Sequence, residues 1–272
     1  RLGEPLEADA PEQAVEWLRR ALESYRAALE RRPGHSGARH NFDLVRRRLA
    51  RVLHQLAIEA LDAAQKQPLD PAIGLLTDGL PKAEEAVLWH PEDASMRVGL
   101  ERIESALKER WIERAAGSET KGDLEAGRNT GWGDLEAEAR YRAALGDLES
   151  ARSRTAAPAG SGARDAAATL SRSATLDASA ARGEKRVREK LSDLLTRMGR
   201  REQKTGDENS KWDTQSALEP YEAALGHFSS ALGVQPDHEG ARQGELEVRA
   251  ALEKLHVRLG NTELEEIGRA HV

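Results

Sequence analysis

The stretch that decides the fold is ALESYRAALERRPGHSGARHNFDLVRRRL, residues 21–49. The small residues Ala21 and Ala28 flank the aromatic residue Tyr25, and Pro33 lies five residues after Ala28. Small residues seven apart, with a bulky residue between them, form a close-packing seam on one face of a helix. Because proline cannot continue that helix, we expect a turn at Pro33 and a second helix after it.

The same layout occurs four times along the chain, which indicates an internal repeat. The seam residues and prolines are Ala21, Tyr25, Ala28 and Pro33; Gly79, Ala83, Ala86 and Pro91; Ala144, Leu148, Ala151 and Pro158; and Ala224, Phe228, Ala231 and Pro236. In the third copy the proline comes two residues late. Six residues past each proline stands an arginine: Arg39, Arg97, Arg164 and Arg242.

Apolar residues recur with helical periodicity, so the sequence predicts an all-α chain. We expect helices at about 11–31, 36–66, 71–89, 92–116, 134–155, 162–204, 214–234, 239–259 and 262–270. The 71–89 helix contains Gly79 and Pro81 and is expected to kink or restart there. Residues 117–133 and 205–213 are expected to be connections. The repeat blocks are about 11–66, 71–116, 134–204 and 214–270, within one continuous domain.

A second regularity links the third and fourth copies. Trp132 and Tyr141 recur as Trp212 and Tyr221, both 80 residues further on, and each tyrosine begins a Tyr-x-Ala-Ala-Leu-Gly run. These two copies therefore look like a duplicated unit, with a tryptophan in the loop ahead of the helix.

Composition narrows the classes of function. Charged residues make up 32% of the 272 residues, aromatic residues 4%, and the formal net charge is −6, which does not indicate nucleic-acid binding. The absence of cysteine excludes disulfides and thiol chemistry. No apolar run reaches the length of about 18 residues that a membrane-spanning helix needs. The chain opens with Arg1, and we expect a processed or trimmed product, from the periplasm or envelope rather than the cytoplasm.

The small–aromatic–Ala–Pro series resembles the second helix of the tetratricopeptide repeat (TPR) family. Ala38, Asn41 and Phe42 are similar to the start of that family's first helix, whereas Arg39 stands where the family prefers Trp and Asp43 where it prefers Gly. The prolines are 58, 67 and 78 residues apart, against a family period of roughly 34. The resemblance implies a right-handed TPR-like α-solenoid of about eight or nine elongated helices. The run at 38–49 also resembles TPR proteins of bacterial aerotolerance operons.

The resemblance further implies binding of peptides or protein surfaces in a concave groove. The four arginines six residues past the prolines, Arg39, Arg97, Arg164 and Arg242, are either a ladder for the carboxylates of an acidic partner or helix-start residues with packed stems and solvated heads. We favour the second interpretation. The basic run at 182–204 is interpreted as a solvated helix face, with an anionic partner as the alternative.

The loop tryptophans, Trp132 and Trp212, also have two interpretations. They are either anchors for a partner, because tryptophan is favoured in interface hot spots, or caps on the hydrophobic layer of their own unit. We favour the capping role, since a repeated residue usually performs a repeated packing role.

The sequence offers no catalytic or metal-binding signature. His35 and His40 are close together but lack metal-ligand spacing. The glycine-rich run at 122–133 lacks the lysine of a phosphate-binding loop. We therefore expect no enzymatic activity, no cofactor and no metal. The prediction is a non-catalytic protein–protein interaction scaffold in a bacterial multiprotein assembly; the alternative is a structural subunit that self-associates into a filament, shell or large complex.

Overall fold

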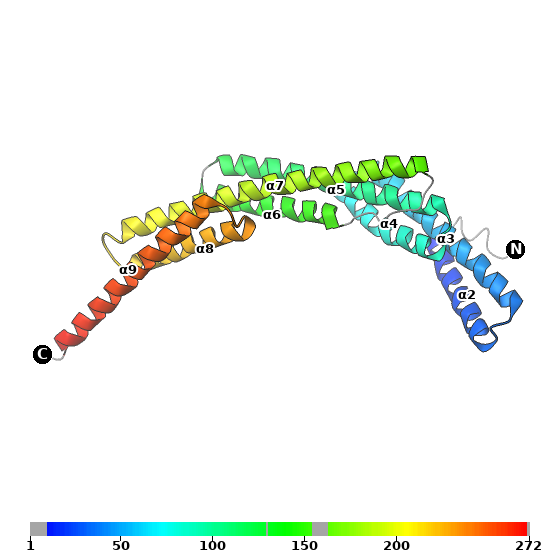
Figure 1. Cartoon of the computed structure of the whole chain (residues 1–272), viewed down its shortest axis with the longest axis horizontal. Coiled ribbons are helices and arrows are strands. Elements are labelled where there is room, and N and C mark those ends of the chain that lie inside the picture. The colour runs from blue at the N-terminus through cyan, green and yellow to red at the C-terminus, as the bar shows by residue number, and fades with distance from the viewer. Residues whose placement is uncertain (1–9, 129, 154–162, 271–272) are drawn as a thin grey trace. The chain divides into compact units, whose positions relative to one another are not determined.

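The computed structural model describes residues 10–128, 130–153 and 163–270; at 163–170, 263 and 265–270 it describes the backbone alone. This part of the chain contains eight α-helices and no strand, which confirms the all-α class (Figure 1). The helices are α2 (Pro11–Arg31), α3 (Ser36–Ala64), α4 (Leu69–Trp89), α5 (Ala94–Gly127), α6 (Gly131–Ser153), α7 (Ala163–Asn209), α8 (Leu218–Val234) and α9 (Glu239–Ala270). A short 3₁₀ turn, Gln215–Ala217, precedes α8.

Three predicted breaks in the helices are wrong. Helix α5 continues through 117–127, α7 through 205–209 and α9 past 259–262. One glycine in each of the first two expected connections is a packing position. A Cβ on Gly122 would lie 2.7 Å from the ring of Tyr141, and one on Gly206 would lie 2.9 Å from the ring of Tyr221. Each glycine therefore makes room for a tyrosine of the following helix.

Helix α4 runs as one helix through Pro81, so of the two expected outcomes, a kink or a restart, the restart does not occur. Gly79 lies on the inner side of this helix, where an added Cβ would lie 2.9 Å from Cβ of Ala60 in α3. The close approach of α3 and α4 at this point shows why a small residue is needed there.

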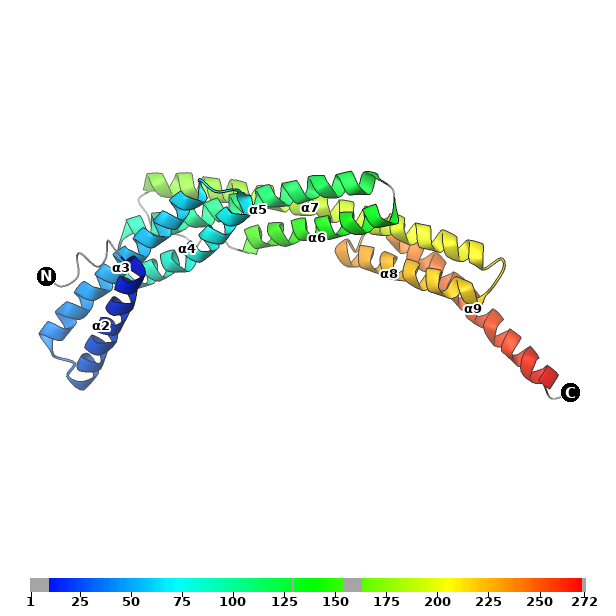
Figure 2. The same ribbon diagram turned by 180° about the vertical axis from the view of Figure 1, so that it is seen from behind.

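The described residues divide into two compact units. Unit 1 comprises the residues up to Arg114 and those from Glu149 to Ala181, and unit 2 comprises Ala115–Leu148 and the residues from Arg182 onward. In unit 1 the core has two parts, one where α3, α4 and α5 meet around Leu61, Leu76 and Leu107, and one where α2 packs on α3 around Leu22 and Leu53. Figure 2 shows α2 and α3 as an antiparallel pair.

The core of unit 2 follows the predicted seam. Tyr221, Ala224, Phe228 and Ala231 of α8 are all buried, and α8 and α9 form an antiparallel pair (Figure 1). The seam alanines Ala86, Ala151 and Ala231 are buried as expected. Ala28 was expected to be buried too but is only half-buried, because α2 is covered on one side by α3 and its seam side is left partly open.

The first half of α7 is thinly packed. Of the described residues from 171 to 182, only Ala180 is buried. The contacts of this segment with α5 are polar: Lys108 Nζ lies 2.8 Å from Asp177 Oδ1, and Arg172 binds Glu109. The segment therefore contributes little apolar burial to unit 1.

Candidate interaction sites

The turn after the seam has the same geometry in three of the four copies. The residue before each proline, Arg32, His90 or Gln235, has a φ within two degrees of −141° and donates its N–H to a seam alanine carbonyl four residues back. The residue two past the proline then caps the next helix. His35 and His238 each accept 3.1 Å hydrogen bonds through Nδ1, from the N–H groups of Ala38 and Ala241.

In the second copy Asp93 takes the place of the histidine and accepts from the N–H of Ser95 at 2.9 Å. A carboxylate and an imidazole nitrogen can both satisfy the free N–H groups of a first helical turn. The Ser95 hydroxyl also donates to Asp93, at 2.6 Å, and this bond, helped by the one from the Ser95 N–H, holds the pKa of Asp93 below its ordinary value. The three turns are thus one structural unit with interchangeable caps.

Two of the predicted arginines belong to this turn. Arg39 donates to the carbonyl of Pro33 and Arg242 to the carbonyl of Pro236, both at 2.9 Å, and both side chains are exposed. Their shared spacing from the proline therefore has a local cause. Arg97 is half-buried, and Arg164 lies in the first turn of α7, where side chains are outside the described residues.

The predicted tryptophans are among the most exposed apolar side chains described. Trp132 in the first turn of α6 is 83% exposed and Trp212 after α7 is 90% exposed. The interpretation that they cap their own hydrophobic layer is therefore wrong. Tyr141 and Tyr221, nine residues after each tryptophan, are buried and fill that layer.

Each buried tyrosine is braced by a Gly-Asp pair at the end of the preceding long helix. The Tyr141 hydroxyl donates to Asp123 at 2.7 Å, and the ring packs on Gly122. The same brace recurs at Tyr221, whose hydroxyl donates to Asp207. Burial, helped by the hydrogen bonds to the carboxylates, raises the pKa of Tyr141 and raises that of Tyr221 to about 12. The sequence analysis missed these pairs, although a Gly-Asp dipeptide precedes both tryptophans.

A hollow of about 350 Å³ in unit 2 lies beside Trp132. Leu135 of α6 and Met198 of α7 supply apolar lining, and Leu135 is itself 54% exposed. The remaining lining residues are Gly131, Arg201, Glu202 and His227. The hollow combines an exposed aromatic ring, a flexible thioether and a charged edge, a composition that suits an apolar side chain of another molecule.

The basic run at 182–204 is largely neutralised within unit 2. Arg186 holds Glu119 through two 2.7 Å bonds, and Lys190 lies 2.7 Å from the same carboxylate. The hydrogen bond from Arg186 keeps the pKa of Glu119 below its ordinary value. Further along α7, Arg197 and Arg201 both bind the buried Asp134 at the start of α6. This face is therefore an internal ion-pair surface that joins α7 to α5 and α6.

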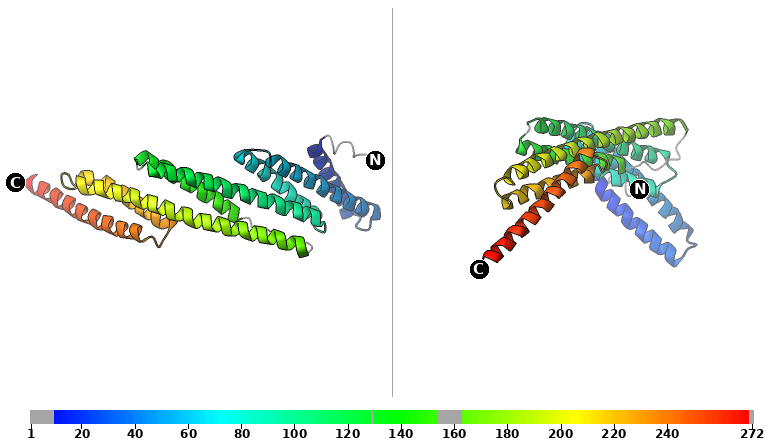
Figure 3. Two further views of the ribbon diagram at one scale, coloured as in Figure 1. Left: turned by 90° about the horizontal axis from the view of Figure 1, so that it is seen from above. Right: turned by 60° about the vertical axis from the view of Figure 1, so that its left-hand side comes forward.

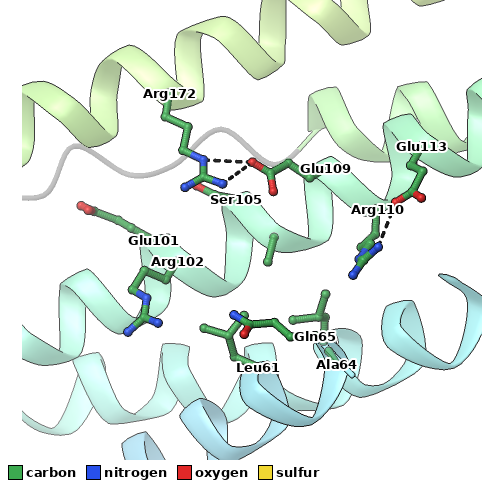
Figure 4. Close-up of a pocket in the computed structure, with 12 residues that line it drawn as sticks. Leu61, Ala64, Gln65, Glu101, Arg102, Ser105, Glu109, Arg110, Glu113 and Arg172 are labelled. Carbon is green, nitrogen blue, oxygen red and sulfur yellow. Dashed lines mark hydrogen bonds and ion pairs between the residues drawn. The ribbon is translucent and has the colours of Figure 1, made fainter. Parts of the chain in front are cut away.

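A larger hollow, of about 590 Å³, lies in unit 1 between α3, α5 and the first half of α7. Figure 4 shows the Arg172–Glu109 pair on one side of the space, with Arg102 and Arg110 flanking Gln65 on the other. The Arg172 guanidinium donates to Glu109 at 2.9 Å, and Arg110 lies 2.9 Å from Glu113. The lining residues include no histidine, and the ion pairs Arg172–Glu109 and Arg110–Glu113 neutralise two of the acidic side chains of the hollow.

Among the residues that the structure describes, no group of three or more histidine, aspartate or glutamate side chains could hold a metal ion. Among the same residues, no helix combines the length and apolarity required to cross a membrane.

No protein-family model matches the chain, and no curated protein is significantly similar to it in sequence.

Proposed function

We propose that the chain is a non-catalytic protein–protein interaction scaffold of a bacterial multiprotein assembly, built as a right-handed TPR-like solenoid. The observation that carries this proposal is the exposed tryptophan pair, Trp132 and Trp212, at the same position of a duplicated helical unit. The three matching turns support the repeat architecture, since one proline-centred turn joins α2 to α3, α4 to α5 and α8 to α9.

Exposed tryptophans at equivalent positions favour a binding role. A solvent-exposed tryptophan gives up the burial of a large apolar surface, so two of them on one small unit mark an interaction surface. Tryptophan supplies a large contact area with only two side-chain torsions to order, which explains its enrichment among hot-spot residues. The helices beneath both tryptophans are held by the tyrosine braces, so both side chains are carried on ordered supports.

The hollow beside Trp132 indicates what kind of group a partner would insert. Leu135 and Met198 offer apolar contact, while Glu202 and His227 provide a polar edge. An apolar side chain flanked by polar residues, as on one face of an amphipathic helix, fits this combination. Arg39 and Arg242 remain exposed and retain further N–H donors, so they are proposed as secondary contacts for carboxylates of the partner.

The test is capture of partners from the native source with tagged protein. A Trp132→Ala/Trp212→Ala variant should lose proteins that the parent recovers, because hot-spot truncations cost about 2 kcal/mol or more each. The matched control is Trp17→Ala, since Trp17 is 63% exposed but lies on α2, outside the duplicated unit. Recovery of the same proteins by the parent and the double variant would contradict the proposal.

A further inference from the structure

The packing of the helices follows one rule in three places. A long helix forms the base on which the next helical pair packs, with a small residue at the contact. Helix α4 meets α3 where Gly79 faces Ala60, α6 meets α5 where Tyr141 covers Gly122, and α8 meets α7 where Phe228 covers Gly199. Helices α3, α5 and α7 thus each carry the pair that follows them in the chain.

Helix α9 repeats one base position of α7, and within the part of the chain that the structure describes no atom covers it. Leu148 of α6 packs over Gly183 of α7, and Phe228 of α8 packs over Gly244 of α9. Leu148 and Phe228 are equivalent, 80 residues apart like the two braced tyrosines, so positions on α7 map onto α9 with an offset of 61 residues, the separation of Gly183 and Gly244.

The offset maps Gly199 of α7 onto Gly260 of α9. A Cβ on Gly199 would lie 2.9 Å from the ring of Phe228, whereas a Cβ on Gly260 would meet no atom within 4 Å. Val257 and Leu264, one turn to either side of Gly260, are 59% and 68% exposed. Figures 1 and 3 show the C-terminal half of α9 extending beyond α8, with no other described helix of unit 2 beside it.

The pair formed by α2 and α3 shows the complementary surface: a seam without a base helix beside it among the described residues. Its turn at Pro33 matches the turn at Pro236, so Tyr25 on α2 corresponds to Phe228 on α8. The seam of α8 is buried against its base helix, whereas the corresponding seam of α2 is half-exposed at all four positions: Leu18, Ala21, Tyr25 and Ala28. This pair therefore presents the surface that a base helix covers elsewhere in the chain.

A contact that occurs twice in unit 2 indicates which residues of the two open surfaces would meet. Glu119 of α5 binds Arg186 of α7, and at the equivalent positions Gln203 of α7 binds Glu247 of α9 at 3.1 Å. The next occurrence would join Leu264, equivalent to Gln203, to Leu44, equivalent to Glu247.

Both residues of this third pair are exposed leucines, and Leu44 is 54% exposed. The first two of these equivalent contacts are polar and lie within one chain. The third would be an apolar contact between the two open surfaces. Charge also favours the fit. Residues 11–64 carry ten arginines against seven acidic residues, while residues 218–270 carry ten acidic residues against five lysines and arginines.

We propose that the α2–α3 pair of one copy of the chain binds the open face of α9 of another copy, with Tyr25 over Gly260 and Leu44 against Leu264. The interface joins two different surfaces, so it is heterologous. In a pair of copies, one copy still has a free α9 face and the other a free α2–α3 face, so further copies can bind. The product is a head-to-tail series of copies, independent of any partner bound at the tryptophans.

The first test is the mass of the purified chain across a concentration series in sedimentation velocity. The parent should grow beyond a dimer as concentration rises. Gly260→Leu should shift this growth to at least tenfold higher concentration, because the added side chain occupies the place of Tyr25. The control is Gly226→Leu, since Gly226 on α8 is also a helical glycine with no atom within 4 Å of an added Cβ. A parent that stays monomeric, or a Gly260→Leu variant that grows like the parent, would overturn the proposal.

A second test does not depend on blocking the interface. The chain has no cysteine, so Leu44→Cys in one preparation and Leu264→Cys in another provide the only thiols. A short bis-maleimide added to the mixture should join the two variants. Leu246→Cys replaces Leu264→Cys in the control; Leu246 is also exposed on α9 but lies about 27 Å away along the helix. Equal cross-linking from both α9 positions, or none from Leu264→Cys, would overturn the proposed register.

Discussion

The Tyr221 hydroxyl donates a 2.6 Å hydrogen bond to Oδ1 of Asp207, fourteen residues earlier in the chain and on the opposite side of the α7–α8 connection. The bond fixes the end of α7 to α8, the two helices that flank the connection containing the exposed Trp212. Tyr221→Phe should destabilise the protein by about 0.5–1.5 kcal/mol, because it removes the donor and leaves the carboxylate unpaired. Urea unfolding measures this loss. Tyr25→Phe is the control, since within the described residues the Tyr25 hydroxyl has no hydrogen-bond partner, and an equal loss there would contradict the prediction.

The raised pKa of Tyr221 predicts an alkaline limit to stability. Its folded pKa is about 12, above the ordinary value of about 10. The folded state therefore holds the proton more tightly, so this contribution is complete below about pH 10 and is lost as the pH rises toward 12. Unfolding free energies measured from pH 9 to 12 should fall more steeply for the parent than for Tyr221→Phe. Parallel curves would show that the tyrosine does not titrate differently on unfolding.

The contact between Gly199 and Phe228 predicts a cost for any side chain on that glycine. Gly199→Ala should lower the free energy of unfolding by about 1–3 kcal/mol through overpacking. Gly226→Ala should instead raise it, by up to about 1 kcal/mol, because alanine is the better helix former and the space there is open. Thermal unfolding of the two variants should therefore shift in opposite directions, and a shift in the same direction would be evidence against the packing rule.

The seam predicts a second matched pair. Ala231 is fully buried, so Ala231→Leu should overpack the site and cost about 1–3 kcal/mol. Ala28 holds the same repeat position but is half-buried, so Ala28→Leu should cost less in the isolated chain. Chemical denaturation at low protein concentration measures both. If Ala231→Leu has unchanged stability, the repeat register is wrong.

The first half of α7 should open more readily than α3. Its described residues from 171 to 182 bury almost nothing apolar, whereas Leu49, Leu53, Ala57 and Leu61 of α3 are buried. Local opening costs little where few apolar contacts are lost. Hydrogen exchange of amides in 171–182 should therefore be faster than in 49–61, and equal protection would count against thin packing there.

The sequence predicted the helical class and the seam because both follow from spacing. Ala86, Ala151 and Ala231 are buried where the repeat places them, and the turns centred on Pro33, Pro91 and Pro236 lie where proline stops a helix. The glycines were the main source of error. Gly122 and Gly206 were interpreted as loop residues, although each receives a tyrosine ring inside a helix. Helix propensity alone cannot distinguish a flexible glycine from one that a neighbouring side chain requires.

The candidate site was predicted only in part. The sequence singled out Trp132 and Trp212 but favoured burial for them, because a repeated residue suggests a packing role. That role belongs to the buried Tyr141 and Tyr221. The exposure of the two tryptophans could not be deduced from the sequence, because it depends on which side of each helix start faces the seam. The phase of the arginines was real, but for Arg39 and Arg242 it reflects a hydrogen bond to a proline carbonyl within the turn.

The most direct measurement is photo-cross-linking from the tryptophan positions in the native source. Trp132 and Trp212 would be replaced, one at a time, by benzoylphenylalanine, with Leu88 of α4, an apolar residue 76% exposed outside the duplicated unit, as the control position. If the two tryptophans bind a partner, both positions should cross-link to a shared set of proteins that position 88 does not label. Cross-links that are absent from 132 and 212, or that match those from 88, would contradict the proposed function.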